Sequence, residues 1–319
     1  MTTLVTGTAG FIGFHTAKAL LEEGEKVIGL DSVNDYYSQQ LKWDRNSLLE
    51  ESDDYVFYQE NLCDLNALKG IFDRHDVDRI CHLAAQAGVR YSVENPHAYQ
   101  RSNLEGFTNV LEMARHNDVS NLVYASSSSV YGGNEDIPYS TGDDVNRPVS
   151  YYAATKVANE VMAHSYSHLY DLNCTGLRFF TVYGPWGRPD MAMFKFTDRI
   201  VDGEPIDVYN YGDMKRDFTY IDDIVEGVLS SLEKRFDYEI FNLGNNTPVE
   251  LMEFIEILED TLGKEAEKNM LPMQPGDMKV TYADISRSKE KLGFEPKTDL
   301  EEGVNRFVDW YKDYYGVDI

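Results

Sequence analysis

Three glycines, spaced three residues apart, separate a short apolar segment from a helical pattern near the start of the chain. Thr3–Thr6 has the composition of a buried strand, the run GTAGFIG at residues 7–13 follows it directly, and Phe11–Glu23 has the apolar periodicity of a helix. Backbone without Cβ atoms can approach a pyrophosphate, and a helix N-terminus offers free N–H groups and positive potential. Because a tight turn must join a strand to a helix here, we expect a fold that begins with a dinucleotide-binding unit.

The first half of the chain alternates between β-rich apolar runs and helical patterns. The pattern predicts strands at Thr3–Thr6, Lys26–Leu30, Tyr55–Gln59, Ile80–Ala84, Leu122–Ala125 and Gly176–Val182. It predicts helices at Phe11–Glu23, Leu65–Arg74, Pro96–His116 and Tyr151–Tyr170, the last two with Asn95 and Ser150 as N-caps. This alternation indicates an α/β fold, a doubly wound parallel sheet of the Rossmann type with helices on both faces.

The rhythm changes in the second half of the chain. GPWGRP at residues 184–189 breaks the alternation, and Thr247-Pro248-Val249-Glu250 has the pattern of a capping box that opens a helix. A last amphipathic helix is expected to start at Thr298 or Asp299, and its apolar face would carry Val304, Phe307, Val308 and Tyr311.

These changes suggest two interleaved domains in a chain of 319 residues. We expect residues 1–180 to form the dinucleotide-binding domain, with a return segment near residues 216–247. Residues 181–319 would then form a smaller C-terminal α/β lobe that binds the substrate.

Composition excludes several classes of protein. With 55 acidic and 29 basic residues the formal net charge is −26, which argues against binding nucleic acid or an anionic membrane surface. No apolar run approaches the roughly 20 residues of a membrane span, and the N-terminus lacks the basic start of a signal peptide. Three scattered cysteines and seven histidines show no metal-ligand spacing, so we expect no metal and a reducing, cytoplasmic compartment.

An acidic residue at the end of the second predicted strand specifies the cofactor. Asp31 lies 21 residues beyond Gly10. A carboxylate at this place accepts hydrogen bonds from ribose hydroxyls and repels a 2′-phosphate, so the sequence predicts NAD rather than NADP.

Hydroxyl and amine groups stand where ligands of a parallel sheet bind. Ser126–Ser129 end the fifth predicted strand, and Tyr152 and Lys156 lie one helical turn apart on one helix face, whereas Tyr151 is rotated away. Free tyrosine titrates near ~10, and we expect Lys156 and an oxidised nicotinamide to lower that pKa. Tyr152 could then take a proton from a sugar hydroxyl that Ser127 holds in place.

Together these residues are similar to those of the extended short-chain dehydrogenase/reductase family, over nearly the whole chain. Within that family, four runs resemble the UDP-glucuronate 4-epimerase subgroup: QAGVRYS at 86–92, GPWGRPDMA at 184–192, KRDFTYIDDIVEG at 215–227 and MQPGD at 273–277. The resemblance implies an isomerase that epimerises C4 of a UDP-sugar, most simply UDP-glucuronate to UDP-galacturonate, through a transient 4-keto sugar. It also implies a homodimer formed by the helices at Pro96–His116 and Tyr151–Tyr170.

The resemblance implies roles for individual residues. The catalytic residues would be Ser127, Tyr152 and Lys156. The positions in NAD-binding motifs are Gly7, Gly10, Phe11, Ile12, Gly13, Asp31, Ser32, Asn61, Leu62, Ala84, Ala85, Gln86, Asn103, Tyr152 and Lys156. The UDP-sugar would contact Arg90, Ser127, Ser128, Ser129, Thr181, Arg188, Arg216 and Asp277. Four positions depart from commoner patterns of the family: Ser32, Asn61, Thr181 and Gln274.

Two serines distinguish this chain from its relatives. Dehydratases carry Asp-Glu, and decarboxylases a glutamate, just before the Val-Tyr-Gly run, where this chain has Ser128 and Ser129. Without these acids elimination is disfavoured, and neutral hydroxyls could orient a sugar carboxylate. The alternatives are a UDP-glucuronate decarboxylase, a UDP-galactose 4-epimerase and an inactive NAD-binding sensor.

Overall fold

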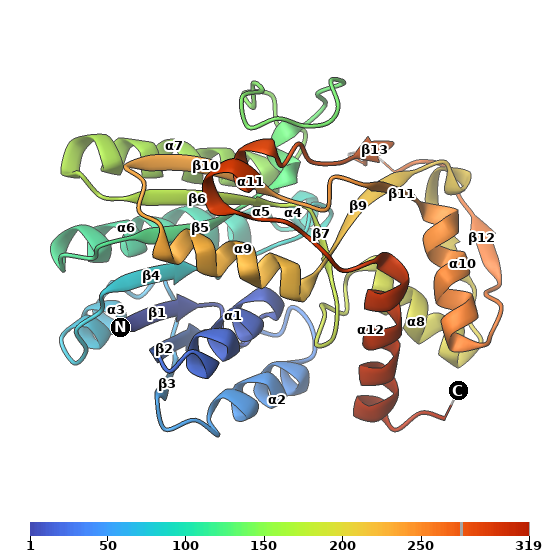
Figure 1. Cartoon of the computed structure of the whole chain (residues 1–319), viewed down its shortest axis with the longest axis horizontal. Helices are drawn as coiled ribbons and strands as arrows, with labels where there is room; N and C mark the ends of the chain where they lie inside the picture. The colour runs from blue at the N-terminus through green and yellow to red at the C-terminus, as the bar shows by residue number, and fades with distance from the viewer. Residues whose placement is uncertain (275–276, 319) are drawn as a thin grey trace.

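Seven parallel strands form the central sheet of the computed structural model, which describes residues 1–274 and 277–318 (Figure 1). Pro275 and Gly276 of the MQPGD run and Ile319 of the expected lobe lie outside the described residues. The strand order is β10-β6-β5-β4-β1-β2-β3. The strands are β1 Thr2–Thr6, β2 Lys26–Asp31, β3 Tyr55–Gln59, β4 Arg79–His82, β5 Leu122–Ser127, β6 Cys174–Phe179 and β10 Tyr238–Leu243.

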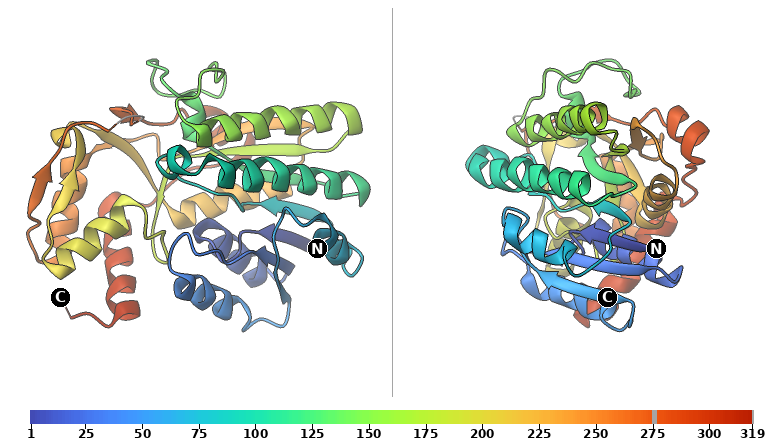
Figure 2. Two further views of the ribbon diagram at one scale, coloured as in Figure 1. Left: turned by 180° about the vertical axis from the view of Figure 1, so that it is seen from behind. Right: turned by 90° about the vertical axis from the view of Figure 1, so that its left-hand side faces the viewer.

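Helices cover both faces of this sheet, because its strands are apolar on both sides (Figure 2). On one face Val5 and Val27 pack with helices α1 (Phe11–Glu22), α2 (Gln39–Leu49) and α9 (Ile221–Glu233). On the other face Leu4 and Ile28 pack with helices α3 (Leu65–Phe72), α6 (Gly106–His116) and α7 (Tyr151–Tyr170). The predicted doubly wound parallel sheet is confirmed.

A second group of short strands lies beyond the carboxyl ends of the main sheet (Figure 1). Strand β9 (Lys215–Tyr220) pairs with β7 (Thr181–Tyr183), β11 (Pro248–Glu250) and β13 (Val280–Thr281). Strands β8 (Ile206–Val208) and β12 (Lys268–Met270) form a separate pair. Helices α8 (Ala192–Asp202), α10 (Leu251–Leu262) and α12 (Leu300–Tyr315) pack beside them.

The chain crosses between these two parts more than once. Strand β9 belongs to the second group, the helix α9 that follows it packs against α1, and β10 then forms an edge of the seven-stranded sheet. After β13, helix α11 (Ser286–Leu292) returns to β10, and α12 ends the described chain among the short strands (Figure 1). Segments that are distant in sequence therefore meet beside the carboxyl edge of the main sheet.

Several local predictions were right and others wrong. Asn95 and Ser150 cap their helices, accepting bonds from Ala98 N–H at 3.3 Å and Ala153 N–H at 3.1 Å. The predicted capping box at residues 247–250 is wrong: Pro248–Glu250 is strand β11, held antiparallel to β9, and α10 begins at Leu251 without a side-chain cap. Pairing of Val249 with Arg216 of the distant strand β9 overrode the local pattern.

Two predicted elements are divided. The segment Gly176–Val182 is two strands, because β6 ends in the main sheet at Phe179 and β7 starts in the second group at Thr181. The predicted helix Pro96–His116 consists of α5 (Pro96–Tyr99), a π-helical turn at Gln100–Glu105 and α6. Such π-helical turns occur frequently at functional sites.

Within residues 1–274 and 277–318, no helix is long and apolar enough to cross a membrane. In the same ranges the three cysteines are free thiols, with Cys81 and Cys174 buried on strands and Cys63 half-buried.

Candidate active site

A cavity of about 640 Å³ lies at the carboxyl ends of the parallel strands. Its wall is formed by the turns after β1, β2, β4 and β5, the start of β7 and the loop before α8. Most residues singled out from the sequence line it: Gly7, Gly10, Phe11, Ile12, Gly13, Asp31, Ser32, Asn61, Leu62, Ala84, Ala85, Gln86, Ser127, Ser128, Ser129, Tyr152, Lys156, Thr181 and Arg188. Four do not: Asn103, Arg90, Arg216 and Asp277.

The glycine run forms a turn that side chains would block. Gly7 has φ of +83°, and a Cβ there would lie 2.8 Å from the backbone nitrogen of Ala84. A Cβ on Gly13 would lie 2.0 Å from the carbonyl oxygen of Gly7. Gly10 is the N-cap of α1 and provides no side-chain cap, so the first N–H groups of this helix remain available to a ligand.

Asp31 is held at the edge of the cavity by the backbone. Its carboxylate accepts bonds from Val33 N–H at 2.8 Å and from Ala9 N–H, in the glycine turn, at 3.2 Å. Burial raises the pKa of Asp31, whereas these N–H groups and the Lys42 ammonium lower it. The oxygens therefore face the cavity in a fixed orientation, where ribose hydroxyls would donate to them.

Asn103 supports the cavity from behind its wall. Its side chain accepts from Gln86 N–H at 2.8 Å and donates to Gln86 O at 3.0 Å and to Thr155 Oγ1 at 3.0 Å. The amide therefore ties the segment after β4 to helix α7, and the residue lies in the π-helical turn. Asn61 lines the cavity, and its Oδ1 accepts from Cys63 N–H at 2.9 Å.

Tyr152 lies in the cavity wall at the start of α7. Burial raises the pKa of its phenol, and a hydrogen bond from Ser127 and the charge of Arg188 lower it. The Lys156 ammonium donates to Ala125 O at 2.8 Å, and its effect on the pKa of Tyr152 stays a prediction. The guanidinium of Arg188 is a cation that favours the phenolate.

Lys156 is a buried ammonium, with 2% of the residue exposed. Burial lowers the pKa of Lys156 to about 8, and Glu160, one helical turn further along α7, opposes that shift. Since its pKa stays above neutral, Lys156 is charged at pH 7. Its bond to Ala125 O places the ammonium beside the end of β5.

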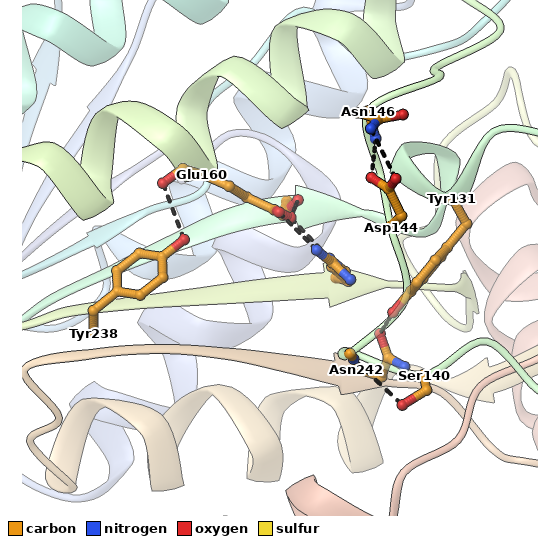
Figure 3. Close-up of polar contacts among 10 residues, drawn as sticks. Tyr131, Ser140, Asp144, Asn146, Glu160, Tyr238 and Asn242 are labelled. Carbon is orange, nitrogen blue, oxygen red and sulfur yellow. Dashed lines mark hydrogen bonds and ion pairs between the residues drawn. The ribbon is translucent and has the colours of Figure 1, made fainter.

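Glu160 connects the lysine to a network of buried polar groups (Figure 3). Arg178 on β6 donates to both carboxylate oxygens, at 2.9 and 2.7 Å, and Ser126 Oγ donates to Oε1 at 2.5 Å. Tyr238 OH donates to the Glu160 backbone oxygen at 3.0 Å, and Tyr131 OH donates to Asn242 Oδ1 at 2.5 Å (Figure 3). This network spans β5, β6 and β10, so it fixes the serines and α7 relative to one another.

Arg188 lines the same cavity as Tyr152 and is paired with an acid of its own loop. Its Nε and Nη2 donate to the two oxygens of Asp190 at 3.0 and 2.6 Å. Burial would lower the pKa of Arg188, but the Asp190 carboxylate more than offsets it. The guanidinium therefore remains charged in the cavity that Ser128, Ser129 and Thr181 also line.

The remaining predicted residues form a cluster outside the cavity wall. Arg90 Nη2 lies 3.5 Å from Asp277 Oδ2, and the Arg90 guanidinium lies 4.9 Å from the centre of the Tyr209 ring. Half-buried Arg216 donates to Lys215 O at 2.8 Å. Burial lowers the pKa of Arg216, and nearby Asp277 raises it.

Sequence reasoning missed the part of the wall that α2 and its preceding loop provide. Asn34, Tyr36, Tyr37 and Lys42 line the cavity, and no motif marks them. The available local signal was Ser38, whose Oγ caps α2 by accepting from Leu41 N–H at 3.3 Å. Burial lowers the pKa of Lys42 to about 8, and its ammonium donates to Asn34 O at 2.6 Å.

These residues fit a dinucleotide. The glycine turn is a cradle that any Cβ would fill, the uncapped helix faces it, and Asp31 offers acceptors for a ribose. Within the ranges that the structure describes, no cluster of three or more His, Cys, Asp or Glu residues could hold a metal.

Comparison with known proteins agrees with this geometry. A model of the NAD dependent epimerase/dehydratase family matches residues 3–244. The chain is 52% identical to protein CapI of Staphylococcus aureus over 99% of both proteins. It is 47% identical to UDP-glucuronate 4-epimerase 4 of Arabidopsis thaliana, over 100% of this chain and 77% of that protein.

A solved structure shares the whole fold. The crystal structure of UDP-glucuronic acid 4-epimerase from Bacillus cereus, in complex with UDP-glucuronic acid and NAD, matches with a TM-score of 0.92. The two proteins are 34% identical, and the match covers 99% of this chain and 100% of the other.

Replacing Lys156 with methionine should remove one contribution to the pH dependence of the free energy of unfolding. The folded-state pKa of about 8 lies below the ordinary 10.5, so the unfolded chain binds more protons between these values. The wild type should therefore gain stability relative to Lys156→Met as the pH rises from about 8 to 10.5, by up to about 3 kcal/mol. Urea unfolding at several pH values measures this difference.

The matched control is Lys18→Met, at an exposed lysine of α1. Its stability difference from the wild type should stay constant over the same pH range. A constant difference for Lys156→Met as well would show that Lys156 is not buried as a charged group.

Proposed function

This chain belongs to the NAD dependent epimerase/dehydratase family, and on that premise we propose that it is an isomerase that converts UDP-glucuronate to UDP-galacturonate. The observation that carries the proposal is the position of Tyr152, which lines the same cavity as the glycine turn, Ser127 and Arg188. UDP-glucuronate 4-epimerases at 47% identity, and one in complex with UDP-glucuronic acid and NAD, support it.

Tyr152 takes the proton of the sugar C4 hydroxyl, and Ser127 holds that hydroxyl by a hydrogen bond. The glycine turn and Asp31 would hold NAD, which would supply the reversible hydride acceptor for C4 and a positive charge beside the phenol. Tyr152 gives the proton back to the C4 oxygen when the 4-keto sugar is reduced. Because burial alone raises the pKa of Tyr152, the phenolate depends on cations such as Arg188.

Lys156 and Asn103 maintain the geometry of this reaction. The ammonium of Lys156 donates to Ala125 O at the end of β5, next to the serines, and would also bond the nicotinamide ribose. Asn103 fixes the backbone of Gln86 and so the cofactor side of the wall.

The cavity wall favours epimerisation over loss of the carboxylate. Oxidation at C4 creates a β-keto acid, which loses CO₂ when its C–C bond aligns with the carbonyl π system. Ser128, Ser129 and Thr181 offer neutral hydroxyls that hold the carboxylate out of this alignment, and neither serine position supplies an acid for proton transfer. Arg188 is a further contact for the carboxylate or the diphosphate.

The nucleotide end of the substrate lies on the second part of the chain. In this proposal residues 1–180, with a return near residues 216–247, hold NAD. Residues 181–319 hold UDP, through Arg216 and Asp277, with Arg90 from the first part beside them. The sugar turns over in the cavity while this end stays anchored.

A second copy of the chain completes the assembly. Helices α6 and α7 lie side by side (Figure 2), joined by Tyr166 OH donating to Glu112 Oε1 at 2.7 Å. Helix α7 exposes Val161 (62%) and Leu169 (64%), which a four-helix contact would cover.

The free thiols fit a reducing cytoplasm.

Sedimentation equilibrium tests the dimer. The wild type should have twice the chain mass of 36.5 kDa, and Val161→Glu/Leu169→Glu should have the single mass, because charge on this face opposes association. A monomeric wild type at micromolar concentration would contradict the homodimer.

Turnover of UDP-glucuronate tests the function directly. The wild type should form UDP-galacturonate, and Tyr152→Phe should lower kcat by about 10³-fold, because no group then takes the hydroxyl proton. Tyr151→Phe is the matched control, since this neighbour is 40% exposed and lies outside the cavity wall. Release of CO₂ with a UDP-pentose as the main product would indicate the decarboxylase instead, and turnover of UDP-glucose alone would indicate the galactose epimerase.

The product ratio tests the role of the neutral hydroxyls. Ser128→Ala and Thr181→Ala should raise the ratio of UDP-pentose to UDP-galacturonate, because the carboxylate gains freedom to align with the carbonyl. Ser165→Ala, on the exposed surface of α7, provides the control. An unchanged affinity and an unchanged ratio in both test variants would refute this role.

A further inference from the structure

Arg45 on helix α2 is a fully buried arginine that no step of the proposed reaction uses. Its Nη1 donates to Ala9 O and to Tyr37 OH, each at 2.8 Å. Its Nη2 donates to Trp186 O at 2.7 Å and to Gly187 O at 2.9 Å. All four acceptors are neutral, so Arg45 forms no ion pair through these bonds. Its planar guanidinium instead connects the segments that carry the four acceptors.

The two terminal nitrogens of the Arg45 guanidinium bond two different segments beside the cavity. Ala9 lies in the glycine turn, between Gly7 and Gly10. Trp186 and Gly187 immediately precede Arg188, which lines the cavity together with Tyr152. A rigid guanidinium therefore sets the distance between the cofactor turn and the backbone that carries Arg188.

The backbone that Arg45 holds is strained. Trp186 has φ of +60°, in the left-handed region that bulky residues rarely adopt. Such a conformation persists only where the surroundings impose it. Nη2 of Arg45 bonds the carbonyl oxygen of Trp186 itself and that of the next residue, Gly187.

Two neighbours hold the same segment to the first part of the chain. His15 Nε2–H on α1 donates to Pro185 O at 2.9 Å, and Tyr36 OH donates to Asp190 Oδ2 at 3.3 Å. Arg45, the buried member of the group, joins three segments of the site: the glycine turn, the loop before α2 and the segment before Arg188.

We propose that Arg45 is a positioning residue that holds Arg188 at a fixed place relative to the glycine turn, so that the sugar carboxylate and the reacting carbon share one frame with the cofactor. The inference rests on the proposed function, because it requires an acidic sugar that faces Arg188. Misplacement of a reacting group by about 1 Å can cost about 10²-fold in rate, so a fixed distance matters here.

A double-mutant cycle tests this role in the NAD-loaded protein. Arg45→Lys keeps the charge but loses the fork, and it should lower kcat/KM for UDP-glucuronate about 10- to 100-fold, mainly through KM. In the Arg188→Lys background the same change should have almost no effect. Inhibition by UDP alone should be unchanged in Arg45→Lys, whereas a general loss of folding would weaken it.

Arg79→Lys is the matched control. Arg79 is also buried, with 3% exposed, but its Nε donates to Thr3 Oγ1 at 2.9 Å, away from the cavity wall. In the double variant, the fold losses in kcat/KM caused by Arg79→Lys and by Arg188→Lys should multiply. If the fold losses caused by Arg45→Lys and by Arg188→Lys also multiply, the inference is overturned.

A milder variant covers the case in which Arg45→Lys does not fold. Tyr37→Phe removes one of the four acceptors and leaves the guanidinium in place; its smaller loss in kcat/KM should also disappear in the Arg188→Lys background. Persistence of that loss would overturn the inference.

Calorimetric binding of UDP-glucuronate separates this inference from the proposed function. A wild type that binds but does not turn over the compound refutes the function, and the same cycle read on affinity then decides the role of Arg45. A wild type that neither binds nor converts it refutes both. Turnover with multiplying effects refutes the role of Arg45 alone.

Discussion

Parallel strands bring their carboxyl ends to one edge of a sheet, and everything in the candidate site depends on this constraint. The glycine turn follows β1, Asp31 ends β2, Ala84 follows β4 and the serines end β5. These residues are spread over more than a hundred positions of sequence, yet they line one cavity. The register of the sheet therefore acts as the frame of the site, and the loops only complete it.

Buried charge determines the chemistry that this frame can support. Lys156 lies between a backbone carbonyl and Glu160, and Glu160 is bound by Arg178 on the next strand. Arg188, which also lines the cavity, is paired with Asp190. Burial raises the pKa of the Tyr152 phenol, and the charge of Arg188 lowers it. A network of this kind keeps the sheet, α7 and the cavity in one arrangement.

Sequence patterns predicted the elements whose cause is local. The turn of GTAGFIG, the one-turn spacing of Tyr152 and Lys156 and the caps of Asn95 and Ser150 each depend on neighbours within a few residues. The pattern at Thr247–Glu250 has the same local appearance, but pairing with β9 made it a strand. Asn103 was predicted as a cofactor-binding residue, but its amide bonds Gln86 from behind the cavity wall instead of facing the cavity.

The sequence by itself determined the doubly wound sheet, the dinucleotide turn and the hydroxyl and amine groups of the site, because periodicity and short spacing specify them. Tertiary structure alone decided that Arg45 joins the glycine turn to Trp186 and that the charge of Arg188 lowers the pKa of Tyr152. The physical reason is that a buried charge takes its partners from whichever backbone the fold brings near, and such partners, here about 140 residues apart in sequence, leave no local pattern.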